Sequence, residues 1–332
     1  DPALPNSPDA EVLAVESAAA DVSFAELVTG RVRPKEVRLR GVAVALRLDA
    51  GGKLLTTLPT LPEGQAGDGP VPLVVVENAR VTVRQEGRPT FTVAGVTLRA
   101  EPSGGKVVLS GGAADPSWGK WKLSGEVDKA AQTGWVDVAT DDAPLNLDLL
   151  RSLPYIPREV WDNAQPAGRG KAVIHLTVGP GAQPDIGYDV RVQPIGAATL
   201  GLPAAEVTLQ EVNGLVRIHD GKVDVGGADG RPAATGTLAG GEARLAGRYD
   251  FTREPSVADP ITVSVDRLAV KDLPAKWGLK NLGGKLPGKL SLEDGFLTGS
   301  AKLKLVVPAK GEVQVFGGGT GHVALPNFLG GK

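Results

Sequence analysis

Apolar and polar side chains alternate along ENARVTVRQEGRPTFTVAGVTLRAEPSGGKVVLSGGAADPSWGKWKLSGEVD, residues Glu77–Asp128. The clearest triplets have an apolar residue on each side of a polar one: Val81-Thr82-Val83, Phe91-Thr92-Val93, Val96-Thr97-Leu98 and Trp121-Lys122-Leu123. Because successive side chains of a β-strand point to opposite faces, each triplet predicts a strand with one apolar and one polar face. The segment therefore predicts half-buried strands of a mostly antiparallel sheet.

The same alternation continues to the end of the chain. Further triplets are Val136-Asp137-Val138, Ile174-His175-Leu176, Val207-Thr208-Leu209, Val216-Arg217-Ile218, Val223-Asp224-Val225, Tyr249-Asp250-Phe251 and Leu303-Lys304-Leu305. Turn signals separate them, namely Glu86-Gly87, Ser103-Gly104-Gly105, Asp220-Gly221, Asp229-Gly230 and Asp294-Gly295. Asp and Gly tolerate the positive φ of tight hairpins, so strands that are neighbours in sequence should pair as meanders. The fold class predicted is mainly β.

Composition agrees with this prediction and excludes several functions. The chain has 332 residues with 45 Gly and 26 Pro, which favours many turns over long helices. Its core must consist mainly of Val, Leu and Ala, because only 6 Phe, 5 Trp and 3 Tyr are present. With 36 basic against 38 acidic residues, nucleic acid is not an expected partner. The absence of Cys removes disulfides, thiolate nucleophiles and Cys metal sites.

Four segments are expected along the chain. Residues 1–58 form a helix-plus-strand lead-in, with the helix at Asp21–Thr29, and residues 59–72 form a loop. Residues 73–165 form a first β module, and residues 166–332 form a second one within the same sheet. The first module ends in a crossover at Leu145–Asn163, which Pro154 and Pro157 break into two short turns. A weak repeat relates this crossover, with Trp161, to the region of Trp277.

Motifs that carry chemistry are weak. His175, His219 and His322 lack the spacing of a zinc site, so we expect outward-facing or turn histidines. Asp220, Asp224 and Asp229 surround two glycine turns, but their spacing does not match a calcium loop, and Asp before Gly is a hairpin signal. No metal site is therefore expected.

Two glycine-rich stretches resemble nucleotide-binding loops only in part. Gly283–Leu290 (GGKLPGKL) has Leu290 where a phosphate-binding loop needs Ser or Thr, and Pro287 removes a donor N–H. Gly317–Gly319 lacks the full dinucleotide pattern, which favours a flexible turn. No convincing pair of carboxylates supports a carbohydrate-active enzyme. We therefore expect a protein that is not an enzyme and holds no cofactor.

The apolar face of such a sheet must be covered, because exposed apolar surface costs about 25 cal/mol per Å². Helices are too few to do so. A second sheet would close the face into a sandwich or barrel, whereas a curled sheet would leave it for bound lipid chains. Alternation alone does not separate these two. The tryptophans Trp118, Trp121, Trp135, Trp161 and Trp277 either fill gaps where strands meet crossovers or contact acyl chains.

Several stretches resemble the AsmA-like superfamily of bacterial envelope proteins. Phe24–Leu54 (FAELVTGRVRPKEVRLRGVAVALRLDAGGKL) is similar to its N-terminal pattern of a short helix, two strands and an Asp-x-Gly turn. Glu77–Asp128 resembles its strand module, which ends in Trp-x-Leu-x-Gly at Trp121, Leu123 and Gly125. The crossover Leu153-Pro154 to Trp161, the following Pro166-Ala167-Gly168 and Ile218–Gly236 also fit.

This resemblance implies an elongated, curled sheet that forms a taco-like or half-pipe groove with a few short helices. It implies a non-enzymatic periplasmic protein that helps phospholipids move between the inner and outer membranes. The expected lipid-lining residues are Val81, Val83, Phe91, Val93, Val96, Leu98, Trp121, Leu123, Ile174, Leu176, Val223, Val225, Leu303 and Leu305. The alternative is a closed β scaffold that assists outer-membrane protein assembly or envelope integrity.

The compartment and partners follow from the same expectation. The chain begins at Asp1 and its apolar runs are too short to span a bilayer. We therefore expect a segment of a longer protein, and the resemblance implies that the missing N-terminus holds an inner-membrane anchor. The expected partners are phospholipid or another acyl-chain lipid, and possible envelope proteins.

Overall fold

The computed structural model describes residues 12–22, 34–56, 71–128, 130–180, 186–226, 232–278, 292, 294–308 and 313–325. Within these ranges the chain is mainly β, with a mixed, mostly antiparallel sheet of seventeen strands and a few short helices. The predicted fold class is confirmed in these terms. Two predicted elements lie largely outside the described residues: the helix at Asp21–Thr29, of which Asp21 ends a strand, and the loop at 59–72.

By its internal contacts the chain divides into two compact units. Unit 1 comprises Asp1–Pro144, Asp148–Ile156 and Ala172–Val190, and unit 2 comprises Leu145–Leu147, Pro157–Lys171 and Arg191–Lys332. Strands β8 (Gln165–Val178) and β9 (Ile186–Leu202) contribute residues to both units. The segment boundaries expected at residues 58, 72 and 165 stay predictions.

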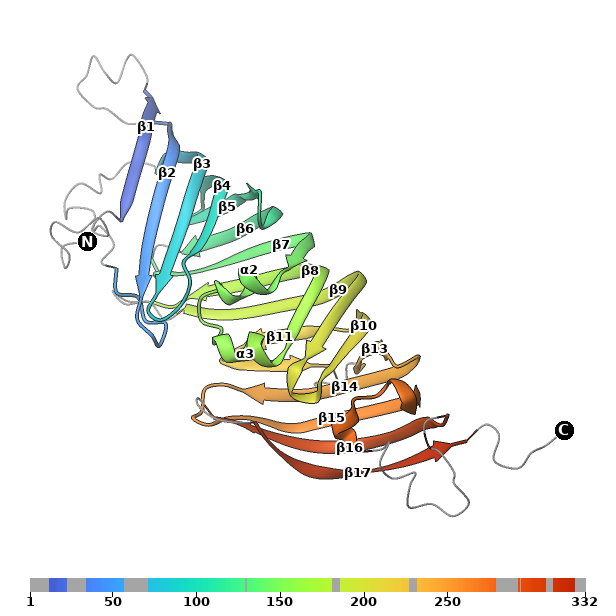
Figure 1. Ribbon diagram of the computed structural model, residues 1–332. Helices are drawn as coiled ribbons and strands as arrows, with labels where there is room; N and C mark the ends of the chain where they lie inside the picture. Colours follow the sequence, from blue (N-terminus) through green and yellow to red (C-terminus); the bar gives the residue numbers. More distant parts are fainter. Residues whose placement is uncertain are drawn as a thin grey trace. The chain divides into compact units, whose positions relative to one another are not determined.

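Unit 1 begins with seven strands that lie side by side in chain order (Figure 1). They are β1 (Leu13–Asp21), β2 (Glu36–Leu48), β3 (Leu73–Gln85), β4 (Phe91–Ser103), β5 (Lys106–Asp115), β6 (Gly119–Asp128) and β7 (Thr133–Leu145). The pairs from β3 to β7 are antiparallel neighbours, as the meander prediction requires. The pair β2–β3 is parallel, so the prediction is wrong there. Strand β1 was not expected from the sequence.

Two bulges hold the apolar residues of β3 and β4 on one face. Val76 pairs with Leu98 and Ala79 pairs with Val96, so β3 carries one extra residue between these pairs. Asn78, with φ of 52°, lies in that bulge. Gly95, with φ of 63°, lies in the compensating bulge of β4. Each bulge inserts one extra residue into its strand, so the alternation of faces shifts by one position there. The apolar side chains before and after the bulge therefore point to the same face.

The crossover after β7 consists of two one-turn helices, as predicted. They are α2 (Leu147–Arg151) and α3 (Arg158–Asn163), and Pro157 stands at the N-terminal end of α3. Between them, the Tyr155 backbone N–H donates to Gln85 Oε1 at 2.9 Å. Arg88 Nη1 donates to the Ile156 carbonyl at 2.5 Å. These bonds fix the crossover to the end of β3.

Unit 2 contains the remaining strands. They are β10 (Val207–Asn213), β11 (Val216–His219), β12 (Lys222–Val225), β13 (Ala234–Leu238), β14 (Gly241–Asp250), β15 (Ser256–Ala269), β16 (Phe296–Val307) and β17 (Gln314–Ala324). Short 3₁₀ helices join some of them: η1 (Pro203–Ala205), η3 (Val270–Asp272) and η4 (Ala275–Trp277). Strand β14 pairs with β13 over its first half and with β12 over its second half. From β14 to β17 the strands pair in chain order.

Candidate functional site

The apolar face of unit 1 is the candidate site. It is the side of the sheet on which alternate residues of β2 to β8 are apolar. Cross-strand pairs identify it, because directly opposite residues point to the same face. Val83 pairs with Phe91, and Val81 pairs with Val93. Further along the ladder, Leu98 pairs with Gly111, which in turn pairs with Leu123.

The expected lining residues of unit 1 all lie on this face. They are Val81, Val83, Phe91, Val93, Val96, Leu98, Trp121, Leu123, Ile174 and Leu176. The placement of Ile174 and Leu176 follows from His175, whose Nδ1 lies 2.6 Å from the Asp137 carboxylate on the opposite face. Their neighbours in the strand must therefore point to the apolar face.

One end of the apolar face is closed by aromatic and crossover residues. Trp118 is buried in the turn between β5 and β6, and its ring centroid lies 5.5 Å from that of Phe91. The turn itself is held by Asp115, whose carboxylate accepts the backbone N–H groups of Ser117 and Trp118. At the same end of the sheet Ile156 is buried. We call this the closed end.

The rest of the face is only half-buried. Side chains such as Val93, Leu98 and Leu123 keep part of their surface exposed. At the end opposite the closed end, Val127 is 36% exposed. A valine or leucine inside a sandwich core would be sealed by side chains of a facing sheet. Within the described residues, the middle of this face has no such seal.

In unit 2 the remaining lining candidates also share one face. Val223 pairs with Tyr249, which pairs with Ala258, which in turn pairs with Leu305. The adjacent row runs from Val225 through Gly247 and Ile261 to Leu303. Sequence alternation therefore placed both pairs of candidates on the apolar face of their strands.

Parts of unit 2 are sealed more completely than unit 1. Leu268 and Val270, where β15 runs into η3, are fully buried. Leu209, Val212 and Ala243 form a buried cluster against which Leu200, Leu202, Leu238 and Val265 pack. Helix η4 is fixed to η1, because Trp277 Nε1 donates to the Ala205 carbonyl at 3.1 Å. The short 3₁₀ helices between strands thus bury apolar side chains of the sheet, as a second sheet would do in a sandwich.

Asp224 is the buried charge that sequence reasoning misjudged. Its side chain is 5% exposed, although alternation placed it on a solvent face beside a turn. Arg248 Nε lies 2.5 Å and His219 Nε2 lies 2.9 Å from its carboxylate oxygens. Burial alone raises the pKa of Asp224, but the hydrogen bonds from Arg248 and His219 outweigh it and hold this pKa below its usual value. His219 ends β11 beside the turn, as expected, but it is half-buried and contacts both Asp220 and the buried Asp224.

The remaining histidines and glycine-rich motifs lie on strand faces, in turns or outside the described residues. His175 and His322 lie on the polar face of their strands, and His175 stacks on Trp135. Asp220 occupies a turn with φ of 47°, whereas Asp229 lies outside the described residues, as does Gly283–Leu290. Gly317–Gly319 is part of strand β17, so the flexible turn expected there is wrong. Among described residues no group of three His, Asp or Glu side chains is arranged to hold a metal.

The tryptophans divide between the two roles considered. Trp118 and Trp161 are buried beside turns or short helices and fill gaps there. Trp121 lies on the apolar face, where its Nε1 donates to the Trp118 carbonyl at 2.7 Å. Trp135 is 36% exposed on the opposite face of the sheet. Trp277, in η4, donates its Nε1 to the Ala205 carbonyl. Trp121 is thus the tryptophan that lies on the half-buried part of the apolar face of unit 1.

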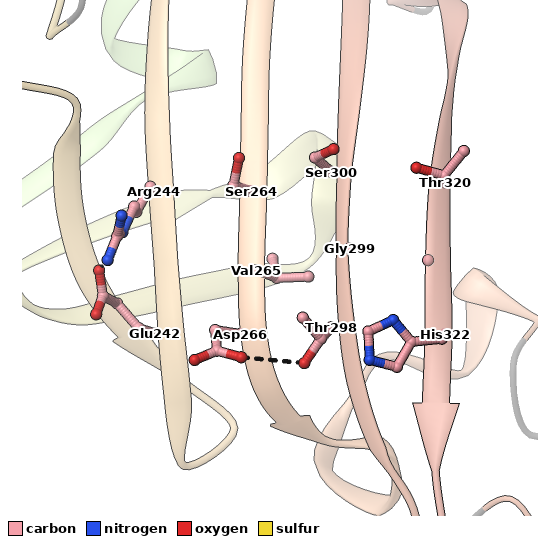
Figure 2. Close-up of a pocket in the computed structure, with 11 residues that line it drawn as sticks. Glu242, Arg244, Ser264, Val265, Asp266, Thr298, Gly299, Ser300, Thr320 and His322 are labelled. Atoms are coloured by element: carbon pink, nitrogen blue, oxygen red, sulfur yellow. Dashed lines mark hydrogen bonds and ion pairs between the residues drawn. The ribbon is translucent and has the colours of Figure 1, made fainter.

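The polar face of unit 2 carries a shallow hollow that the sequence did not indicate. Figure 2 shows Arg244, Ser264, Ser300 and Thr320 on neighbouring strands β14 to β17. Thr298 Oγ1 donates to Asp266 Oδ1 at 3.1 Å, which is the dashed contact in the figure. These side chains come from one open face of a sheet and do not converge around an enclosed point.

Comparisons with protein-family models, with curated proteins and with solved structures found no match. A search of the described helices found none that is long and apolar enough to cross a membrane.

Proposed function

We propose that the apolar face of unit 1 binds the acyl chains of phospholipids. The observation that carries this proposal is the half-buried state of an apolar face that spans neighbouring strands. Each CH₂ group that leaves water gains about 0.8 kcal/mol. An acyl chain that lies on Leu98 and Leu123 would therefore remove apolar surface of both the protein and the lipid from water.

The two faces of the sheet differ in a way that suits an amphipathic ligand. Oppositely charged pairs occupy the other face, such as Arg40 with Glu77 at 2.9 Å and Lys106 with Glu126 at 2.6 Å. The apolar face between its two ends presents Val, Leu, Ala, Phe and Trp side chains. Acyl chains would contact these side chains by dispersion and burial alone, and headgroups would remain in solvent. Such contacts are non-directional, which permits sliding.

The wider role proposed is that of a non-enzymatic lipid-transfer protein of the cell envelope. In this proposal the chain is an AsmA-like periplasmic segment, anchored to the inner membrane in the full-length protein. Its curled sheet would form a groove through which phospholipids move between the inner and outer membranes. The support is the sequence resemblance together with the one-sided sheet of unit 1. No chemical step is required of any residue.

The test compares two substitutions at adjacent positions of β4. Leu98→Asp places a charge on the apolar face, whereas Thr97→Asp places the same charge on the exposed opposite face. Native mass spectrometry of gently purified protein should detect bound phospholipid in the unmodified chain and in Thr97→Asp. The Leu98→Asp variant should lose most of it, and should also lose transfer of a fluorescent phospholipid between vesicles.

Two outcomes would count against the proposal. One is a lipid-free unmodified chain that takes up no phospholipid from vesicles. The other is equal lipid loading of Leu98→Asp and Thr97→Asp while both keep the circular dichroism spectrum of the unmodified chain. Either result would show that the apolar face of unit 1 is not where lipid binds.

The alternative function is a closed β scaffold that assists outer-membrane protein assembly or envelope integrity. The complete burial of Leu268 and Val270 in unit 2 favours it, because a sealed core needs no ligand. If unit 1 were sealed too, Leu98→Asp would bury an uncompensated charge and cost several kcal/mol of unfolding free energy. An open face predicts a cost of about 1 kcal/mol, since water reaches the new carboxylate. The unfolding free energy of this variant in urea therefore distinguishes a sealed face from an open one, and with it the two proposed functions.

A further inference from the structure

Strand β17 forms an exposed edge in unit 2. It pairs with β16 in one unbroken register, from Phe296 opposite Ala324 to Val306 opposite Gln314. In the described part of unit 2 it is the last strand in the row (Figure 1). Val315 is 57% exposed and Phe316 is 53% exposed. Among the described strands only β16 pairs with β17, so in this part of the chain the outer side of β17 presents a row of backbone N–H and C=O groups.

This edge lacks the usual protection against strand addition. Natural edge strands are blunted by charged side chains, Pro or bulges. β17 has the sequence QVFGGGTGHVA, with no charged residue and no Pro, and its register with β16 has no bulge. Strand β1, the first strand of unit 1, differs because it carries Glu16 and Asp21. β17 is thus the edge that is suited to pair with another strand.

The sequence of β17 is nearly symmetric about Gly319. An antiparallel pair of two β17 strands centred there places Val315 opposite Val323 and Phe316 opposite His322. It also places Gly318 opposite Thr320. A two-fold interface requires a surface that is complementary to itself. In this register valine lies opposite valine, the ring of Phe316 lies opposite the ring of His322, and no two like charges face each other.

We propose that two copies of this chain associate through antiparallel pairing of their β17 strands about Gly319. The pairing also preserves the two faces. Val315 and Val323 lie on the apolar face, since they pair with Leu305 and Leu297, whereas Phe316 and His322 lie on the polar face with Lys304 and Thr298. Each face of one copy therefore continues into the same face of the other. The dimer goes beyond the proposed lipid binding and is tested without any lipid.

The register is tested with engineered cysteines, because the chain has no Cys of its own. Gly318→Cys and Thr320→Cys are separate variants, and a Cβ at position 318 meets no atom within 4 Å. In the proposed pair, position 318 of one copy faces position 320 of the other, with Cβ atoms about 5 Å apart. A small adjustment of the strands then permits a disulfide. Mixing the two variants under mild oxidation should give a covalent dimer that contains one chain of each.

Each variant oxidised alone is the control, since identical positions then lie diagonally and about 7 Å apart. Cross-linking should be several-fold slower there. Equal cross-linking in the mixture and in the two controls would overturn the proposed register. Absence of cross-linking in all three would overturn the pairing itself.

Sedimentation velocity tests the association without cysteines. The unmodified chain should show a species of twice its 34.1 kDa mass that dissociates on dilution. The double variant Gly318→Lys/Thr320→Lys places like charges opposite each other twice and should weaken association about 5-fold or more. The single variant Thr320→Lys should weaken it less. A monomer at every concentration, or growth beyond the dimer into open polymers, would overturn the proposal.

Discussion

Replacing Arg248 with Met should lower the unfolding free energy of unit 2 by about 2 to 3 kcal/mol. The reason is the carboxylate of Asp224, which is 5% exposed and receives hydrogen bonds from Arg248 and His219. Removing one partner of a buried ion pair costs about 3 to 5 kcal/mol, because a charge is left without compensation. The Arg248 side chain is 46% exposed, so its own charge is well solvated and the expected cost falls at or below the lower end of that range.

The cost depends on pH with a defined sign. Burial raises the pKa of Asp224, but hydrogen bonds from Arg248 and His219 bring it below its usual value. A carboxylate with a lower pKa in the folded state stabilises the fold above its unfolded pKa of about 3.9. This stabilisation is lost as the pH falls through the folded pKa. The difference between the unmodified chain and Arg248→Met should therefore be full at pH 7 and shrink below about pH 4.

Urea unfolding monitored by circular dichroism measures this effect. A double-mutant cycle with Asp224→Asn separates the pair from the individual side chains. In the Asp224→Asn background, Arg248→Met should cost much less than in the unmodified chain. The reasoning is refuted if Arg248→Met lies within about 0.5 kcal/mol of the unmodified chain at pH 7, or if its cost is the same in both backgrounds.

Three further predictions concern packing, backbone and turn geometry. Leu268→Ala should cost about 3 kcal/mol in urea unfolding because that side chain is fully buried, whereas Leu98→Ala should cost about 1 kcal/mol because it is half-buried; equal costs would contradict an open face in unit 1. Gly95→Ala should destabilise the fold more than Gly87→Ala, although both glycines have positive φ. A Cβ at position 95 would meet a carbonyl oxygen, whereas a Cβ at position 87 would meet open space. The melting temperatures of the two variants test this prediction, and equal values would contradict it. Burial raises the pKa of the Asp115 carboxyl, but hydrogen bonds from three backbone N–H groups outweigh burial and hold this pKa below its usual value. Asp115→Asn should therefore lower the unfolding free energy by about 1 kcal/mol at pH 7 and by less below about pH 4. A cost that grows on acidification would contradict this prediction.

Much of the fold follows from the period of two in the sequence. The hairpin of β4 and β5 was predictable because Gly104 and Gly105 adopt the positive φ that their turn requires. The parallel pairing of β2 with β3 was not, because alternation looks the same in parallel and antiparallel strands. Strand β1 (Leu13–Asp21) was missed because its run of Ala carries little contrast between faces.

The candidate site was predictable in its side chains but not in its cover. Val93 and Leu98 lie on one face because of the bulge at Gly95. No local sequence pattern predicts this bulge, so strict alternation would place the two residues on opposite faces. The burial of Asp224 depends on Arg248, which is distant in sequence, so a triplet pattern cannot show it. Gly317–Gly319 suggested a turn by composition, yet glycine there permits close approach of β17 to the backbone of β16.

The parallel pair β2–β3 has a consequence for the order of folding in unit 1. From β3 to β7 each strand meets its successor through a short turn, so these contacts close small loops at little entropic cost. The antiparallel pair β1–β2 instead joins the meander across the interval from Leu48 to Leu73, and β2 runs parallel to its neighbour β3. Such non-local pairing is slow. We therefore expect the residues synthesised first in unit 1 to dock last, onto a meander that has already formed.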